Sequence, residues 1–124
     1  MAKRVILVVE DETDLAKILA RRLIDHDFEV SIATDAYQGI SSTMSEHPSL
    51  VILDLMLPAG GGLSVLKNMR LNPKTMNIPV VVITGIKDPE YEKKVLAEGV
   101  QAYFQKPYEF TVVLQKIKEL LKME

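Results

Sequence analysis

The chain has 124 residues, of which 48% are hydrophobic and 26% are charged, and this is the size and composition of one compact globular domain. Fifteen basic residues against seventeen acidic ones give a formal net charge of −2, so we expect no direct binding to nucleic acid. The absence of cysteine excludes disulfides, thiolate zinc sites and a cysteine nucleophile, and with only two histidines any bound metal should be a hard ion on oxygen ligands.

A short aliphatic run at residues 5–9 is the first predicted strand. Three acidic residues, Glu10, Asp11 and Glu12, follow it directly. The run is too short to cross a membrane, and no signal-peptide cleavage pattern accompanies it. We therefore expect a cytoplasmic protein with no membrane partner.

Four further segments complete the predicted set of strands. Residues 29–33 alternate between polar and apolar side chains, which is typical of a strand near the edge of a sheet. Residues 50–55, 80–83 and, more weakly, 102–104 are apolar on both alternating faces. Burial on both faces favours a parallel sheet that is covered by helices.

Between these strands, hydrophobic residues recur with the period of an amphipathic helix. The predicted stripes are Leu15, Ile18, Leu19 and Leu23; Tyr37, Ile40 and Met44; Leu63, Leu66 and Met69; Val95 and Leu96; and Phe110, Val113, Leu114, Ile117, Leu120 and Leu121. Asp88 before Pro89 predicts the N-cap of the fourth helix, and Gly99 predicts the left-handed residue at its end. The alternation predicts an α/β fold over residues 1–124, a (βα)5 doubly wound five-stranded parallel sheet.

Ligands of such a sheet bind beyond the carboxyl ends of its strands, so the polar residues found there are the candidate site. Glu10 and Asp11 follow the first strand, Asp54 lies inside the third, Thr84 follows the fourth and Lys106 follows the fifth. A carboxylate that is desolvated without a partner costs several kcal/mol, so stability alone does not account for Asp54 in its apolar surroundings.

Three acids at one edge of a sheet repel one another, because two unit charges about 4 Å apart cost roughly 4 kcal/mol at an effective dielectric near 20. A Mg²⁺ ion held by Asp11, and less directly by Glu10, would offset that repulsion. An aspartate can itself be the nucleophile in phosphoryl transfer. These residues therefore predict attack of Asp54 on phosphorus, with Lys106 and Thr84 binding the phosphoryl oxygens.

Over essentially its whole length the sequence resembles the receiver domain of two-component response regulators, in its single-domain form. The matching segments are residues 8–12, 53–58, 83–85 and 103–107. The resemblance implies a flavodoxin-like fold with strand order 2-1-3-4-5. It also implies a cis peptide bond between Lys106 and Pro107.

The same resemblance implies a site and a partner. Asp54 would receive a phosphoryl group from the phosphohistidine of a histidine kinase or of a histidine phosphotransfer protein. Glu10, Asp11, Asp54 and the backbone carbonyl of Met56 would hold Mg²⁺. The domain would not be an enzyme in the usual sense, because its chemistry would be limited to phosphotransfer onto itself and slow loss of the phosphoryl group.

A switch is implied as well. The hydroxyl of Thr84 would move to the phosphoryl group, and Tyr103 would rotate into the space that is released. The surface formed by the fourth helix, the fifth strand and the fifth helix would then change shape and control an output protein. We expect a monomer or a phosphorylation-dependent dimer.

Two features depart from the family pattern. Gly61 stands where the family usually has an acidic residue before the third helix, so the loop 58–62 is predicted to be mobile. Met56 and Ile86, at positions that tune the access of hydrolytic water in the family, are apolar here. We therefore expect a comparatively long-lived aspartyl phosphate.

The sequence leaves one other form of the same family open and disfavours unrelated functions. An alternative is that the chain is the excised receiver of a longer DNA-binding regulator or of a hybrid histidine kinase. A phosphatase resembling haloacid dehalogenases would need a second aspartate where Met56 stands. A flavin carrier would place phosphate beside Glu10, Asp11 and Glu12, which would repel it, and the glycines at 60–62 lack the Lys-Ser or Lys-Thr of a nucleotide-binding loop.

Overall fold

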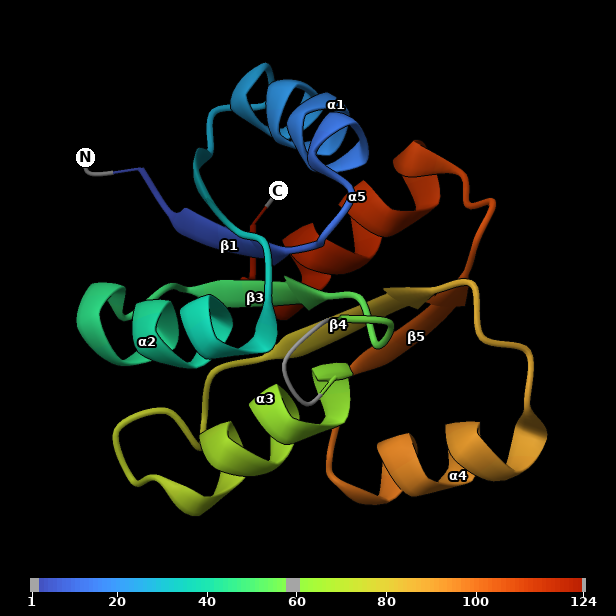
Figure 1. Cartoon of the computed structure of the whole chain (residues 1–124). Coiled ribbons are helices and arrows are strands. Elements are labelled where there is room, and N and C mark those ends of the chain that lie inside the picture. The colour runs from blue at the N-terminus through green and yellow to red at the C-terminus, as the bar shows by residue number, and fades with distance from the viewer. Residues whose placement is uncertain (1–2, 58–60, 124) are drawn as a thin grey trace.

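The computed structural model describes residues 3–57 and 61–123, in which five strands alternate with five helices (Figure 1). The strands are β1 (Val5–Val9), β2 (Glu29–Ala33), β3 (Leu50–Leu53), β4 (Val80–Thr84) and β5 (Ala102–Gln105). The helices are α1 (Thr13–Ile24), α2 (Ala36–Glu46), α3 (Gly61–Leu71), α4 (Pro89–Ala97) and α5 (Phe110–Leu120). Most of the loop that is predicted to be mobile, residues 58–60, lies outside the described residues. Within those described ranges, every helix is too short or too polar to span a bilayer.

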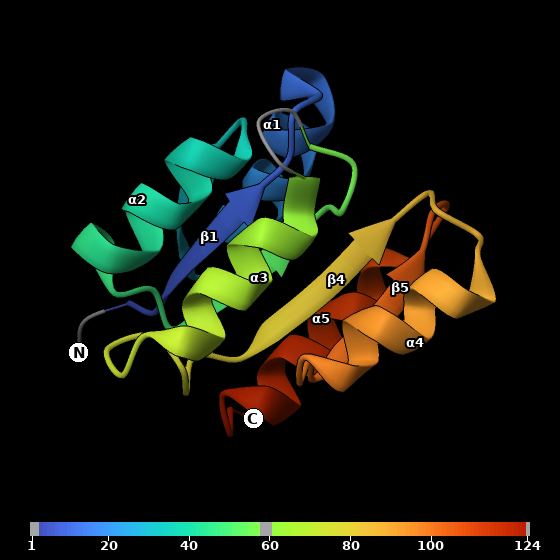
Figure 2. The same cartoon turned by 60° about the horizontal axis from the view of Figure 1, so that its bottom comes forward.

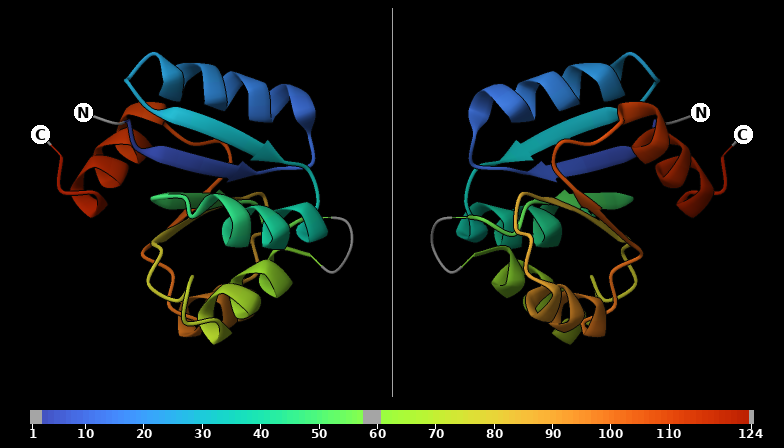
Figure 3. Two further views of the ribbon diagram at one scale, coloured as in Figure 1. Left: turned by 90° about the vertical axis from the view of Figure 1, so that its left-hand side faces the viewer. Right: turned by 90° about the vertical axis from the view of Figure 1, so that its right-hand side faces the viewer.

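The five strands form one parallel sheet in the order β2-β1-β3-β4-β5, which confirms the predicted doubly wound, flavodoxin-like fold. Helices α1 and α5 cover one face of the sheet, and α2, α3 and α4 cover the other (Figures 1 and 3). Figure 2 turns the second face toward the reader, with these three helices lying side by side over the strands. The position of β2 at the edge confirms the prediction from its alternating sequence.

Each face of the sheet has its own hydrophobic core, because successive residues of a strand point to opposite sides. In β1, Ile6 and Val8 join the core under α1 and α5, and Leu7 and Val9 join the core under the other three helices. Residues of β3 and β4 divide in the same way. Burying one such aliphatic side chain contributes roughly 1.5–3 kcal/mol, so the three central strands anchor the fold.

The predicted stripe of α1 is wrong at two positions. Leu15 is 41% exposed and Ile18 is 60% exposed. Ala16 and Ala20 are buried instead, beside the two other leucines of the stripe. Alanine occupies little volume, so the helix approaches the sheet most closely along its alanine side and its larger residues are displaced to the rim.

In two other helices, a residue of the predicted stripe is also exposed. Tyr37 of α2 is 78% exposed, and Leu96 of α4 is 45% exposed although its neighbour Val95 is fully buried. In α2 the residue that faces the sheet is Gly39, where a Cβ would lie 3.1 Å from Cγ1 of Val9. The close approach of the helix to β1 therefore selects a small residue at the centre of the buried face.

The third strand is shorter than its sequence predicts. Residues 50–55 are apolar apart from Asp54, yet β3 ends at Leu53. The amide of Asp54 still donates to the carbonyl of Val9, 3.0 Å away, whereas the ladder with β4 ends at the pair Leu53 and Val82. Asp54 therefore lies just beyond the strand and not inside it, and Leu55 is buried without being part of the strand.

The predicted boundaries of α4 are confirmed. The carboxylate of Asp88 accepts a hydrogen bond from the amide of Glu90 at 3.0 Å, and Pro89 occupies the first turn. Gly99 has a φ of +85° just after the helix. The peptide bond between Lys106 and Pro107 is cis, as the family resemblance implies.

Arg70, near the end of α3, connects three segments at the end of the sheet opposite to the predicted site. Its guanidinium donates hydrogen bonds of 2.9–3.4 Å to the backbone carbonyls of Met76, Ile78, Glu98 and Gly99 and to the side-chain carbonyl of Gln101. Two of these carbonyls lie directly after α4, where the negative end of the helix dipole favours a cation. Burial lowers the pKa of Arg70 from its usual value.

Candidate functional site

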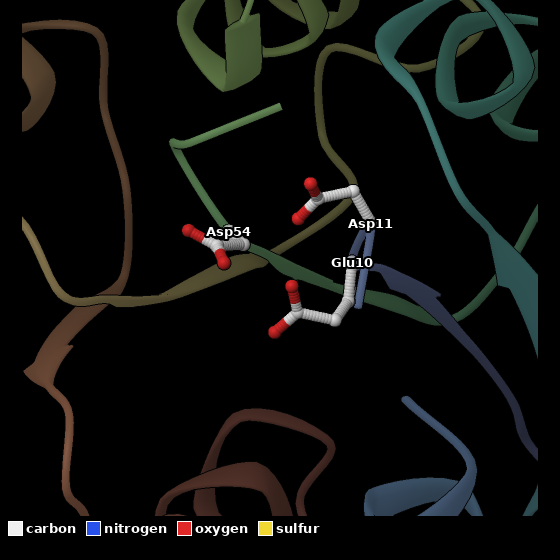
Figure 4. Close-up of side chains that lie close together, drawn as sticks. All are labelled: Glu10, Asp11 and Asp54. Atoms are coloured by element: carbon white, nitrogen blue, oxygen red, sulfur yellow. The ribbon is translucent and has the colours of Figure 1, made fainter. Parts of the chain in front are cut away.

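Three carboxylates meet at the carboxyl ends of β1 and β3. Glu10 and Asp11 follow β1, Asp54 follows β3, and one oxygen from each lies within 4.8 Å of the others. Figure 4 shows the carboxylates of Glu10 and Asp11 turned toward Asp54. Glu10 and Asp54 are only 7% and 6% exposed, whereas Asp11 is exposed.

The sheet register brings these residues together. Val9 is paired with Leu53, so the residues that follow the two strands emerge beside each other. The hydrogen bond from the Asp54 amide to the Val9 carbonyl extends this pairing by one residue. Parallel neighbouring strands therefore deliver the acids to one edge, as the sequence analysis expects.

Lys106, the residue directly after β5, completes the cluster. Its Nζ donates to Oε1 of Glu10 at 2.6 Å and to Oδ2 of Asp54 at 2.9 Å. The backbone amide of Lys106 donates to the carbonyl of Thr84 at 2.8 Å, which fixes the start of the loop after β5. The Lys106 side chain is 25% exposed. Charge-assisted hydrogen bonds hold its ammonium group in the acidic pocket.

Both oxygens of Asp54 have a partner. Oδ1 accepts a hydrogen bond from the amide of Met56 at 3.0 Å, while Oδ2 accepts the one from Lys106. Oε2 of Glu10 accepts a hydrogen bond of 3.3 Å from the amide of Glu12. The cluster is therefore built partly from backbone amides, which hold the carboxylates in defined orientations.

The charges of the pocket are not balanced by the protein alone. Burial, followed by the hydrogen bond and charge of Asp54, raises the pKa of Glu10 to about 7 despite the opposing effect of Lys106. For Lys106, burial lowers the pKa, but the hydrogen bonds and charges of Glu10 and Asp54 outweigh burial and raise it. Three carboxylates face one ammonium, so the donor set fits one further hard cation on oxygen ligands.

Thr84 is the last residue of β4, and Tyr103 lies within β5. Thr84 is fully buried, and its hydroxyl accepts a hydrogen bond of 3.2 Å from the amide of Ile86. Tyr103 is half-buried and, like Ile86 and Tyr91, packs against the core under α2, α3 and α4; its hydroxyl is buried without a hydrogen-bond partner among the described residues. Burial, and then the nearby charges of residues on α4 and at its N-cap, raise the pKa of this hydroxyl.

The sequence did not indicate a cleft of about 450 Å³ that opens next to the acidic cluster. It lies on the face of the sheet covered by α1 and α5. Its lining residues are Val8, Val9, Glu10, Leu15, Ala16, Ile18, Leu19, Ile52, Asp54, Ile83, Lys106, Pro107 and Tyr108. Two residues of the predicted α1 stripe, Leu15 and Ile18, are among those that line it.

Comparisons with known proteins agree with this geometry. The model of the response regulator receiver domain family matches residues 6–118. The response regulator ArlR of Staphylococcus aureus is 32% identical over 119 residues, which cover 96% of this chain and 53% of ArlR. The chain therefore spans about half the length of the curated relatives it matches.

Solved structures give the same result. A CheY-like response regulator receiver domain protein from Methanospirillum hungatei is 30% identical, with a TM-score of 0.90 and coverage of 98% of this chain and 95% of that one. The signal receiver domain of a DNA-binding response regulator from Colwellia psychrerythraea is 28% identical, with a TM-score of 0.89 and coverage of 98% and 100%. Both likenesses extend over nearly the whole chain.

Proposed function

Since this chain belongs to the response regulator receiver domain family, we propose that it is a phosphorylation-controlled signalling domain of a two-component system whose phosphoacceptor is Asp54. One observation carries the proposal. The Asp54 carboxylate lies 2.9 Å from the Lys106 ammonium and beside two further acids, at the edge of the sheet where such a fold binds its ligands. We place its action in the cytoplasm.

The phosphoryl donor is the phosphohistidine of a histidine kinase or of a histidine phosphotransfer protein. An oxygen of Asp54 forms the new bond to phosphorus as the bond between phosphorus and the histidine nitrogen breaks. The electron pair of that bond goes to the imidazole, which then takes up a proton. Lys106 and the hydroxyl of Thr84 bind phosphoryl oxygens, so that negative charge is stabilised where it develops.

The acidic cluster holds Mg²⁺ in this proposal. Glu10, Asp11, Asp54 and the backbone carbonyl of Met56 would hold the ion. When bound, the ion neutralises charge on the phosphoryl oxygens. The support from this chain is its donor set, in which the oxygens of three carboxylates lie within 4.8 Å of one another.

Phosphorylation acts through Thr84 and Tyr103. Thr84 moves its hydroxyl to the phosphoryl group, and Tyr103 responds beside it, so that the surface of α4, β5 and α5 changes and controls an output protein. The buried hydroxyl of Tyr103 has no hydrogen-bond partner among residues 3–57 and 61–123. No hydrogen bond therefore fixes the side chain in its present position, which supports its movement on phosphorylation. The domain acts as a monomer or as a phosphorylation-dependent dimer, without direct binding to nucleic acid.

The direct test uses purified protein, Mg²⁺ and a small acyl phosphate, followed by measurement of the intact mass. One phosphoryl group per chain is expected, because the acyl phosphate replaces the kinase as donor. Addition of a chelator should prevent the modification. An unchanged mass with several acyl phosphates would refute the proposed function.

The cleft beside the acidic cluster is where the phosphohistidine donor docks. Leu15 and Ile18 of α1 are exposed at its rim, and Tyr108 lines it from the loop before α5. These residues line the same cleft as Asp54, so a partner that reaches Asp54 along the cleft contacts them. Apolar side chains at the centre of a contact commonly provide most of its binding energy.

Ile18→Asp is therefore expected to slow phosphoryl transfer from the cognate histidine kinase by about tenfold or more, which corresponds to the loss of one apolar anchor. Transfer from a small acyl phosphate should stay at the wild-type rate, because Ile18 has no group that takes part in the transfer. The matched control is Val112→Asp on α5, where the valine is 52% exposed and lies outside the cleft. Equal slowing with both donors would contradict docking at this cleft.

The lifetime of the aspartyl phosphate follows from two apolar residues near the site. Met56 is 59% exposed, and Ile86 is half-buried after β4. Neither side chain can orient a water molecule for attack on phosphorus. Met56→Asn and Ile86→Glu are each expected to shorten the half-life several-fold, measured by following the phosphorylated mass after the donor is removed. A half-life that becomes longer in either variant would overturn this expectation.

One further proposal concerns the length of the natural protein. The match covers about half of ArlR, and the Colwellia receiver belongs to a DNA-binding regulator. An alternative to a single-domain regulator is therefore the receiver of a longer DNA-binding regulator or of a hybrid histidine kinase. The sequence of the gene beyond codon 124 distinguishes these forms.

A further inference from the structure

Gly62, in the first turn of α3, lies against the backbone that carries Asp54. A methyl group on its Cα would lie 2.6 Å from the Cα of Leu55 and closer still to the carbonyl oxygen of Asp54. Carbon atoms in contact prefer separations of about 3.5–4.0 Å. Both obstacles are backbone atoms, which cannot turn aside as the end of a flexible side chain can.

The described glycines near the site differ in this respect. Gly61 has a φ of +75°, but a Cβ there would meet only the carbonyl oxygen of Leu55, at 3.6 Å. Gly85, next to Thr84, would have no heavy atom within 4 Å of a new Cβ. Gly61 is therefore required for its backbone conformation, whereas Gly62 is required for the space between α3 and the segment after β3.

A hydrogen bond reinforces this contact. The amide of Gly62 donates to the carbonyl of Leu55 at 3.0 Å, so α3 is joined to the same backbone it touches. On the other side of the site, the backbone of Lys106 is placed independently by the hydrogen bond that its N–H donates to the carbonyl of Thr84. A shift of the Asp54 backbone would consequently change the distance between its carboxylate and the ammonium group.

We infer that Gly62 is a positioning residue for phosphoryl transfer, because its contact with the Asp54–Leu55 peptide sets the placement of the Asp54 carboxylate relative to Lys106 and the other two acids. This inference rests on the proposed function. Gly62 touches neither donor nor metal, and it acts through the peptide that it contacts.

The test compares Gly62→Ala, Gly61→Ala and Gly85→Ala with the wild-type protein. Modification by a small acyl phosphate is followed by intact mass, Mg²⁺ binding by calorimetry, and the folded fraction by circular dichroism. For Gly62→Ala we expect the modification rate to fall by roughly 10–100-fold, since a displacement of about 1 Å can have such an effect. We also expect weaker Mg²⁺ binding by folded protein.

The two controls separate positioning from stability. Gly85→Ala should match the wild-type protein in all three measurements. Gly61→Ala should unfold more easily but, when corrected for its folded fraction, react and bind Mg²⁺ like the wild-type protein. If Gly62→Ala does not fold in buffer, the whole series is measured in sucrose, which favours the folded state.

The outcomes distinguish the two proposals. If the wild-type protein is modified and Gly62→Ala reacts and binds Mg²⁺ no worse than Gly61→Ala, Gly62 has no positioning role and only the further inference fails. If the wild-type protein takes up no phosphoryl group, the proposed function fails and the inference fails with it.

Discussion

Asp54→Asn protein is expected to stay unmodified under conditions in which the wild-type protein takes up one phosphoryl group. The amide oxygen of asparagine is a poor nucleophile, so the bond to phosphorus cannot form at this position. The substitution keeps the shape of the side chain and its ability to accept the hydrogen bond from Met56. It also removes one charge from a crowded acidic pocket, so the fold should be retained.

The test is to incubate the protein with Mg²⁺ and a small acyl phosphate and then to measure its intact mass. Asp25→Asn is the matched control, because Asp25 is an exposed aspartate at the end of α1 that forms a surface ion pair with Arg21. This control should be modified like the wild-type protein. A phosphoryl group on the Asp54→Asn protein would show that the phosphoacceptor is a different residue.

Lys106→Met is expected to slow modification by acyl phosphate by about 10²–10³-fold, the usual effect of removing one preorganised charge-stabilising donor. Methionine has a similar length but no charge, so the two hydrogen bonds to Glu10 and Asp54 are lost. The two buried carboxylates would then face each other without their ammonium. We therefore also expect a lower free energy of unfolding in the absence of Mg²⁺.

The loss of stability should be smaller than the roughly 3–5 kcal/mol typical of a broken buried ion pair, because the Lys106 side chain is 25% exposed. Mg²⁺ should restore more stability to Lys106→Met than to the wild-type protein. Lys93→Met is the control, since the side chain of Lys93 is 76% exposed and forms a surface ion pair with Glu90. A Lys106→Met protein that is modified at the wild-type rate would contradict the role of the ammonium group.

The strand pattern was largely predictable because burial on both faces leaves a strong signal. The runs at residues 5–9 and 29–33 coincide with β1 and β2. The run at residues 50–55 extends past β3, because Leu55 is buried beyond the end of the strand. Hydrophobicity thus reports burial, and a buried residue just outside a strand cannot be distinguished from one inside it.

Helix faces were predicted less well. Size decides which side of a helix meets the sheet, and Ala16 and Gly39 are small enough to approach closely. A pattern that counts only large apolar residues assigns that side to Ile18 and Tyr37, which are exposed. The exposed residues of α1 instead form the rim of the cleft.

The candidate site was predictable in its composition, because the carboxyl ends of parallel strands meet at one edge. The structure brings Glu10, Asp11, Asp54 and Lys106 together as expected. The contact made by Gly62 could not be foreseen, because it depends on how closely α3 approaches the segment after β3. The roles of Thr84 and Tyr103 came from the family resemblance and stay predictions.

The hydrogen bonds of Arg70 affect how α4 can move. They hold the carbonyls of Glu98 and Gly99 at one end of the helix, whereas Pro89, at the other end, is exposed. A nine-residue helix is about 13 Å long, so a small rotation about the Arg70 end displaces the distant turn the most. We expect α4 to tilt about the end that Arg70 holds. The displacement of its backbone should therefore increase along the helix toward Pro89.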